Sequence, residues 1–219
     1  MYNRSSALRI SDGVTGSLMG RTLGYLALLI LILSASVLLS PLAGRVGIWI
    51  GIAAALLGTI MVGRNAWTAG RAFIWGAVVA IGMGLLVGPV VWSVAVTQSG
   101  LLWTTLGTLV IAVVFSALLV SVVPWDFSRL MPLLFLGLIM LIVTGALSWF
   151  IPSISGVVMS KAYNLIGTLI FIGYLMVDFS LMRLRGRVVP TQGTAVVLAV
   201  SLLIDIVNLF LFLLRLGRR

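Results

Sequence analysis

Two aspartates stand inside long apolar stretches of the sequence. Asp205 lies near the middle of "SLLIDIVNLFLFLL" (201–214), and Asp178 lies in "FIGYLMVDFSLMRLRGR" (171–187). A charged side chain at the centre of a bilayer costs about 2.5–3.5 kcal/mol on insertion scales. Because the chain has only four acidic residues and no glutamate, two acids at such positions indicate a functional site.

Further polar residues share a helical face with each aspartate. In the last apolar stretch they recur at i, i+4, i+7 and i+14: Ser201, Asp205, Asn208 and Arg215. In the preceding stretch Tyr174 and Asp178 are four residues apart, and Arg185 follows seven residues later. A polar stripe on an otherwise apolar helix must face a bundle interior or water.

If the two stripes face each other, the two carboxyl groups meet. Like charges in a medium of low dielectric constant cannot both ionise cheaply, so the pair shares a proton and titrates as a unit. The shared proton would hold the helices together, and its loss would push them apart. Arg64, Arg183 or Arg185 would tune this latch by favouring the ionised forms. Two alternatives stay open: a static hydrogen-bonded pair, or an Asp178 that only pairs with an arginine.

The composition indicates an integral membrane protein. Hydrophobic residues make up 62% of the chain and charged residues 8%, against about 25% charged residues in soluble domains. The net charge of +10 comes from basic residues spread between apolar runs, which is typical of membrane loops and not of a nucleic-acid surface. The absence of cysteine and histidine excludes thiol chemistry and the usual general base and metal ligand.

Seven apolar runs are long enough to cross a membrane as helices. They cover residues 22–40, 46–66, 72–96, 101–123, 130–151, 162–182 and 192–214. Residues 1–20 form a polar leader, and no connection between runs could hold a soluble domain. The sequence therefore predicts an all-α membrane protein with seven transmembrane helices, forming a single helical bundle over residues 21–219.

The distribution of basic residues predicts the orientation. With the N-terminus inside, nine of the 14 basic residues lie on the inner side, and five lie on the outer side. This favours a cytoplasmic N-terminus, and we expect a bacterial inner membrane. Arg215, Arg218 and Arg219 oppose this orientation, and a last segment that re-enters the membrane would place them inside. A signal peptide cleaved near "SAS" (34–36) is the alternative to a retained first helix.

Small residues predict where helices approach closely. Three stretches have the small-xxx-small spacing of membrane helix contacts: Gly16/Gly20/Gly24, Gly47/Gly51 and Gly84/Gly88. Pro89 is expected to kink the third span. The other two acidic residues, Asp12 in the leader and Asp126 in a loop, are expected to be solvated.

Four stretches resemble the Bax-inhibitor family, the TMBIM-type seven-helix membrane proteins. "AVSLLIDIVNLFLFLLRLG" (199–217) resembles the family's last helix, and "GRTLGYLALLILILSA" (20–35) its first. "PWDFSRLMPLLFLGLIM" (124–140) is similar to the start of its fifth helix, and "YLMVDFSLMRLRG" (174–186) to the end of its sixth. In this chain Val177 stands where the family usually has a tyrosine, and the second span contains no acidic residue.

The resemblance implies a central last helix wrapped by the other six, and a pH-sensitive aspartate pair that maps onto Asp178 and Asp205. It also implies a cation leak, usually described for calcium, with no cofactor. Calcium takes 6–8 oxygen ligands in most protein sites, so two carboxylates would form only a weak, transient metal site, better suited to passage than to storage. The implied partners are the bilayer, cations and another membrane protein.

Three other functions compete with a channel. An intramembrane aspartyl protease also pairs acids on adjacent helices, but Leu202, Leu203 and Ile204 replace the glycines expected before its second aspartate. We therefore expect no enzyme activity. A non-transporting regulator of a partner protein, such as a membrane protease or a stress or cell-death component, stays open. A substrate transporter has less support, because no inverted repeat or paired broken helices stand out.

Overall fold

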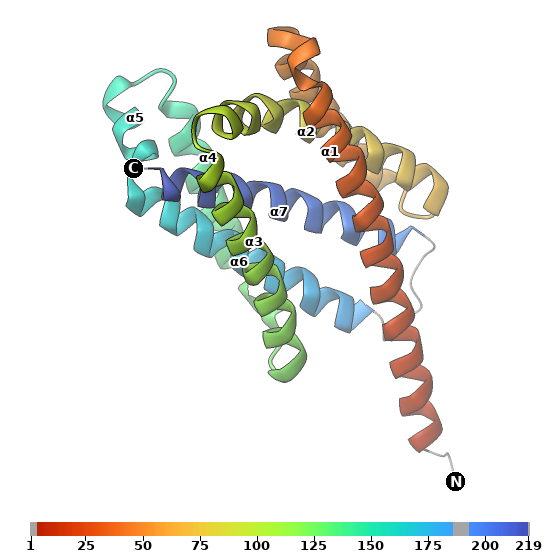
Figure 1. Cartoon of the computed structure of the whole chain (residues 1–219). Coiled ribbons are helices and arrows are strands. Elements are labelled where there is room, and N and C mark those ends of the chain that lie inside the picture. The colour runs from red at the N-terminus through yellow and green to blue at the C-terminus, as the bar shows by residue number, and fades with distance from the viewer. Residues whose placement is uncertain (1–3, 186–192, 219) are drawn as a thin grey trace. The chain divides into compact units, whose positions relative to one another are not determined.

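The described chain is entirely helical. The computed structural model describes residues 4–185 and 193–218, with side chains from residue 18 onward apart from that of Arg185. Figure 1 shows the course of these helices. They are α1 (Arg4–Arg64), α2 (Ala69–Thr97), α3 (Ser99–Val122), the 3₁₀ helix η1 (Phe127–Leu130), α4 (Met131–Leu147), α5 (Pro152–Met159), α6 (Lys161–Arg185) and α7 (Thr194–Gly217).

Six of the described helices are long and apolar enough to cross a membrane. The first of these segments, Leu18–Arg64, has 47 residues and would be about 70 Å long as one straight helix, twice the thickness of a hydrocarbon core of about 30 Å. Gly44 interrupts it with φ 54° and ψ −146°, so the helix is kinked there. The stretches on either side of Gly44 correspond to the first two predicted spans.

The prediction of seven membrane helices is confirmed. Each predicted span falls on one helix or, for the first two, on one half of α1. The largest difference in a boundary is at the first span, because α1 already begins at Arg4, and at the fifth span α4 ends at Leu147 instead of residue 151. α7 is long enough to cross the bilayer completely, so its length gives no reason for a re-entrant segment. Its central position among the other helices stays a prediction.

The short helix α5 was not predicted. Its eight residues follow Ile151 and begin with Pro152, which is favoured at the first position of a helix. The buried side chain of Asn164 joins this helix to α6, because Nδ2 donates hydrogen bonds to the carbonyl oxygens of Val158 and Ser160. The "IPSISG" stretch is therefore an ordered helical connection.

The chain divides into two compact units. Unit 1 comprises Met1–Ser93 and Leu181–Ile204, and unit 2 comprises Val94–Ser180 and Asp205–Arg219. Both α6 and α7 contribute residues to each unit, with the divisions after Ser180 and before Asp205. Asp178 and Asp205 therefore both belong to unit 2. The predicted single bundle and the polar leader stay predictions.

Glycines bring α1 and α2 close together in unit 1. A Cβ atom added at Gly51 would lie 2.8 Å from the carbonyl oxygen of Gly82, and one at Gly84 would lie 2.6 Å from the Cβ of Ser36. The spacing of Gly47/Gly51 and Gly84/Gly88 therefore marks real helix contacts, as predicted.

The Gly16/Gly20/Gly24 spacing does not mark such a contact where it is described. A Cβ atom at Gly20 or Gly24 would meet nothing within 4 Å. The side chains of residues 4–17 lie outside the described part, so Gly16 and the expected solvation of Asp12 stay predictions.

The helix α2 continues through Pro89 to Thr97.

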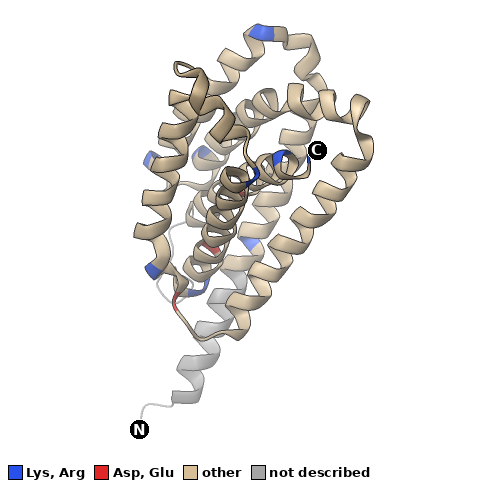
Figure 2. Cartoon of the chain, turned by 90° about the vertical axis from the view of Figure 1, so that its left-hand side faces the viewer, with Lys and Arg blue, Asp and Glu red and all other residues tan. Residues whose placement is uncertain are grey.

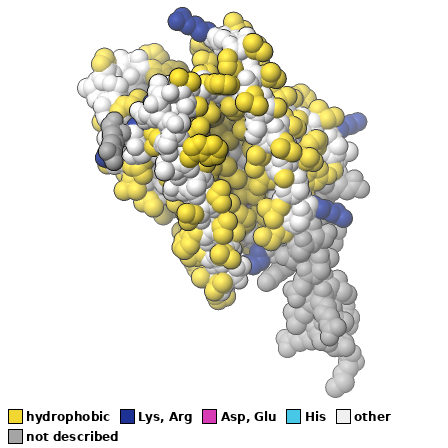
Figure 3. Space-filling view, in the orientation of Figure 1, with side chains coloured by type: hydrophobic (Ala, Val, Ile, Leu, Met, Phe, Trp, Pro, Cys, Tyr) yellow, Lys and Arg dark blue, Asp and Glu magenta, His cyan; other side chains and the backbone are white. Residues whose placement is uncertain are grey.

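The surface has the character expected of a chain in lipid. Large apolar side chains are exposed on most of the long helices, and hydrophobic atoms cover much of the face seen in Figure 3. Lysine, arginine and aspartate appear as a few isolated segments on the ribbon (Figure 2). A surface of this kind is stable only against hydrocarbon, because in water the exposed apolar area would drive aggregation.

Candidate functional site

One face of α6 carries Asp178 at one end and a glycine at the other. Gly167, Phe171, Tyr174 and Asp178 are spaced i, i+4, i+7 and i+11, which places them in one row along the helix. Phe171, Tyr174 and Asp178 are buried. The apolar helix therefore turns its polar and aromatic residues away from the lipid, as the stripe predicted.

The matching face of α7 is formed by Asp205 and Phe212, seven residues apart. The Phe212 ring stacks on Phe171 with ring centroids 5.7 Å apart, and a Cβ atom at Gly167 would collide with the same ring. Asp205 lies at the Asp178 end of the row. The order of these contacts means that α6 and α7 run antiparallel within unit 2, packed closely because residue 167 has no side chain.

The two aspartates meet, as predicted from the sequence. Their side chains are hydrogen-bonded to one another, and only 4% of Asp178 and 7% of Asp205 are exposed. Two carboxyl groups form such a bond only when one of them carries a proton, because an ionised carboxylate can only accept. Asp205 Oδ2 is buried and has no hydrogen-bond partner among the described residues. The two carboxyl groups are thus held in direct contact, and at least one proton is needed for the bond between them.

Tyr174 lies beside this pair. It is four residues before Asp178 on α6, is 9% exposed, and lies near Asp205. A phenol can both donate and accept a hydrogen bond. Tyr174 therefore lies next to the aspartate pair, and its part in the site stays a prediction.

The polar stripe of α7 continues from Asp205 to a small cavity in unit 2. The cavity has a volume of about 180 Å³ and is bounded by α4, α6 and α7, with Asn208 and Arg215 in its lining. The hydroxyl of Tyr163, which also lines it, donates a 2.7 Å hydrogen bond to the Leu141 carbonyl oxygen. A cationic side chain at this place would oppose the entry of a cation and favour an anion.

A second polar cluster involves Asp126, which is partly exposed but has a structural role that the sequence prediction missed. Asp126 is not simply solvated, because it caps the N-terminus of η1. Its Oδ1 accepts hydrogen bonds from the Ser128 amide at 3.0 Å, the Ser128 hydroxyl at 2.6 Å and the Ser180 hydroxyl on α6 at 3.3 Å. Ser180 is two residues beyond Asp178, so this cap ties the loop before α4 to the end of α6 that carries the site.

The hydrogen bonds fix the charge of Asp126. Donation from the Ser128 hydroxyl, and then from the Ser128 amide, holds the pKa of the Asp126 carboxyl below its usual range. The sequence did contain a signal for this cap. An aspartate two residues before a serine, at the start of an apolar run, is typical of an N-cap, and "PWDFSR" has that pattern.

Three of the remaining predicted residues are assigned to the other unit. Ser201 on α7 and Arg183 on α6 belong to unit 1, and so does Arg64 at the end of α1. The side chain of Arg185 lies outside the described part. The roles of Arg64, Arg183 and Arg185 as charge partners therefore stay predictions.

The acidic pair does not form a ready metal site. Among the described residues there is no group of three or more aspartate, glutamate, histidine or cysteine side chains that could hold a metal ion. Two carboxyl groups supply fewer oxygens than the 6–8 that calcium usually takes. Any cation held by Asp178 and Asp205 would need water or backbone oxygens to complete its shell.

Comparison with known proteins gives one match over nearly the whole chain. The family model described as "Inhibitor of apoptosis-promoting Bax1" matches residues 15–218. The match covers all six long apolar segments and both aspartates of the pair. No curated protein matches the chain.

Proposed function

Because the chain belongs to the Bax inhibitor family, we propose that this integral membrane protein is a pH-sensitive cation leak channel, with calcium as its permeant ion. Asp178 and Asp205 would form the gate. The observation that carries the proposal is the hydrogen bond between these two buried carboxyl groups on neighbouring helices. We place the N-terminus in the cytoplasm, and the protein in a bacterial inner membrane.

The shared proton acts as a latch between α6 and α7. While one carboxyl group is protonated, it donates to the other and the helices are held together. When the proton leaves, two negative charges face each other in a medium of low dielectric constant, where their repulsion is much stronger than in water. Flux is therefore expected to rise as the pH rises through the titration of the pair.

The opened pair suits passage of a cation. Two carboxylates attract a divalent ion but supply too few ligands to hold it, so the ion can leave again. Tyr174 and Asn208 would offer further oxygen atoms along the polar stripe. The protein chain thus provides negative charge at one point of an otherwise apolar bundle.

The test is calcium flux into liposomes that contain the purified protein, measured across about pH 5–8, where coupled buried carboxyl groups can titrate. Asp178→Asn and Asp205→Asn should each keep a hydrogen-bonding side chain but abolish the pH response. The proposal fails if the wild type carries no cation at any pH. It also fails if both variants retain the wild-type pH profile.

One observation favours a second candidate, a regulator that binds another membrane protein and transports nothing. Arg215 lines the cavity that the polar stripe reaches, and its positive charge opposes cation passage there. In that case the aspartate pair only locks the packing of α6 on α7. Absence of flux, together with a lower melting temperature of the Asp205→Asn variant, would support this candidate.

A further inference from the structure

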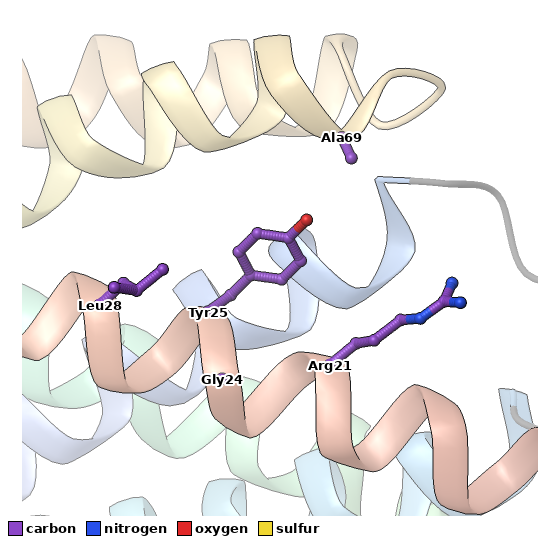
Figure 4. Close-up of a pocket in the computed structure, with 5 residues that line it drawn as sticks. All are labelled: Arg21, Gly24, Tyr25, Leu28 and Ala69. Atoms are coloured by element: carbon purple, nitrogen blue, oxygen red, sulfur yellow. The ribbon is translucent and has the colours of Figure 1, made fainter.

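A cavity of about 540 Å³ opens between α1 and α2 in unit 1, far from the aspartate pair in sequence. Its lining comprises Arg21, Gly24, Tyr25 and Leu28 on α1 and Ala69 at the start of α2. This volume falls within the range of about 300–1,000 Å³ that is typical of small-molecule sites. In Figure 4 the Tyr25 hydroxyl points toward the Ala69 side, and the Arg21 side chain extends from α1 beside it.

Part of the cavity wall on α1 carries no side chain. A Cβ atom at Gly24 would meet nothing within 4 Å, whereas most of the glycines along α2 are packed against neighbouring atoms. The Tyr25 ring is held by Phe73 of α2, with ring centroids 5.6 Å apart. The wall at Gly24 is therefore open, and the wall at Tyr25 is held in place by the contact of its ring with Phe73.

The polar groups of the cavity are cationic or neutral. Arg21 is exposed, and no described residue forms an ion pair with its guanidinium or a hydrogen bond with the Tyr25 hydroxyl. Ala69 is the first residue of α2, and the partial positive charge of a helix N-terminus has the same sign as Arg21. These groups suit an anion with several acceptor oxygens, such as a phosphate ester.

The cavity also has an apolar end that is continuous with the lipid-facing surface. Leu28 lies seven residues after Arg21, about 10 Å further along the helix axis. Leu23, Leu28 and Leu31 are all exposed, and the apolar segment of α1 begins at Leu18. A ligand that fits this arrangement has an anionic head at the membrane surface and a hydrocarbon chain below it.

We infer that this cavity binds the head group of an acidic phospholipid. Its phosphate lies against Arg21 and Tyr25, and its acyl chain runs along Leu28. Basic pockets between membrane helices recognise anionic lipids in this way. The inference does not depend on ion flux, so it and the proposed function can fail separately.

The first experiment is native mass spectrometry of the full-length protein from detergent micelles with equal amounts of dioleoylphosphatidylglycerol and dioleoylphosphatidylcholine. The wild type should retain phosphatidylglycerol preferentially. Arg21→Gln should reduce that preference about fivefold, the effect of one arginine near an acidic membrane surface. Arg45→Gln, which removes the same charge from an exposed arginine outside the lining, should keep it. Equal retention of both lipids by the wild type, or equal losses in the two variants, would overturn the inference.

A second pair of variants tests the cavity without altering charge. Gly24→Leu places a side chain in the open space and should abolish the preference for phosphatidylglycerol. Gly63→Leu is the matched control, because a Cβ atom there also meets nothing within 4 Å and Gly63 does not line the cavity. Retention of phosphatidylglycerol by the Gly24→Leu variant would contradict the site.

An excess of inorganic phosphate distinguishes a lipid from a soluble anion. Because the acyl chain contributes to binding, phosphate should leave the phosphatidylglycerol bound. Displacement of the lipid by phosphate alone would show that the cavity selects a free phosphate, and the assignment to a phospholipid would be wrong. Tyr25→Phe should weaken retention less than Arg21→Gln, because it removes one neutral hydrogen bond.

Discussion

Unit 2 contains three aspartates in two different settings. Asp126 lies at the start of η1, partly exposed, and accepts hydrogen bonds from two serine residues. Asp205 lies within α7, buried, and its hydrogen-bond partner is another carboxyl group. The side chains are chemically identical, and only their neighbours differ.

The difference shows how surroundings decide what a carboxyl group can do. Donors from Ser128 and Ser180 favour the ionised form of Asp126, so its charge is constant near neutral pH and it serves as a structural cap. The Asp178–Asp205 contact needs a proton to exist at all. In the proposed function, a titration would therefore break the second arrangement at a pH where the first is unchanged.

The largest effect is expected from exchanging the acids for asparagine. In the wild type, repulsion between Asp178 and Asp205 is expected to lower the free-energy barrier to opening. A decrease of about 1.4 kcal/mol in that barrier would raise calcium flux about tenfold. Asp205→Asn should remove this pH response, and the double variant with Asp178→Asn should behave like either single variant, because the residues act as one unit. Asp126→Asn is the control and should keep the wild-type pH profile of flux. An altered profile in that control would mean that the two settings are not distinct.

The next largest effect concerns packing rather than charge. Gly167→Ala places a Cβ atom against the Phe212 ring and should lower the free energy of unfolding by about 1–3 kcal/mol, as overpacking does. The loss should be similar at every pH, because no titrating group is changed. Thermal unfolding in detergent measures it. Gly107→Ala in α3, where a Cβ atom meets nothing within 4 Å, is the control and should not destabilise the protein.

A smaller effect is expected from removing the cap. Asp126→Ala should lower the melting temperature at neutral pH, because the amide of Ser128 loses its acceptor. The folded state holds the pKa of Asp126 below its usual value of about 3.9. Ionised Asp126 therefore stabilises the folded protein fully above that value, and this stabilisation is lost as the pH falls through the folded pKa. Asp126→Asn keeps a capping side chain, so it should be more stable than Asp126→Ala while losing this acid-dependent component. Identical acid profiles of Asp126→Asn and the wild type would contradict the assignment.

The smallest effect is expected at Ser180. Its hydroxyl donates to Asp126 over 3.3 Å, which is long for such a bond. When the Ser180 hydroxyl is removed, Asp126 still accepts hydrogen bonds from both donors of Ser128. Ser180→Ala should therefore lower the melting temperature less than Asp126→Ala does. A larger loss would show that the link from η1 to α6, and not the cap itself, stabilises this end of the helix.

The sequence was most informative where residue patterns are long. Runs of about 20 apolar residues predicted every membrane span, and the spacing of Tyr174 and Asp178 placed both on one face of α6. It was least informative where structure is short or depends on distant contacts. The eight residues of α5 are too few for a periodic pattern, and its junction with α6 depends on the buried side chain of Asn164.

Two further features could not be predicted for physical reasons. The Gly16/Gly20/Gly24 spacing is typical of a helix contact, yet whether a partner fills the space beside a glycine depends on the path of the next helix. At Gly24 none does, and a cavity results. The cap by Asp126 has a signal in "PWDFSR", but its hydrogen bond with Ser180 could not be predicted because it joins residues 54 positions apart.

The break at Gly44 has a consequence for how the protein is made. The apolar stretch Leu18–Arg64 has only a few residues around Gly44 and Arg45 to separate its halves, so the change of direction between them has to form within that short stretch. The positive φ at Gly44 is a conformation that side chains disfavour. A straight α1 would leave every later span in the opposite orientation. The kink at Gly44 is thus expected to influence the orientation of every later span during biosynthesis.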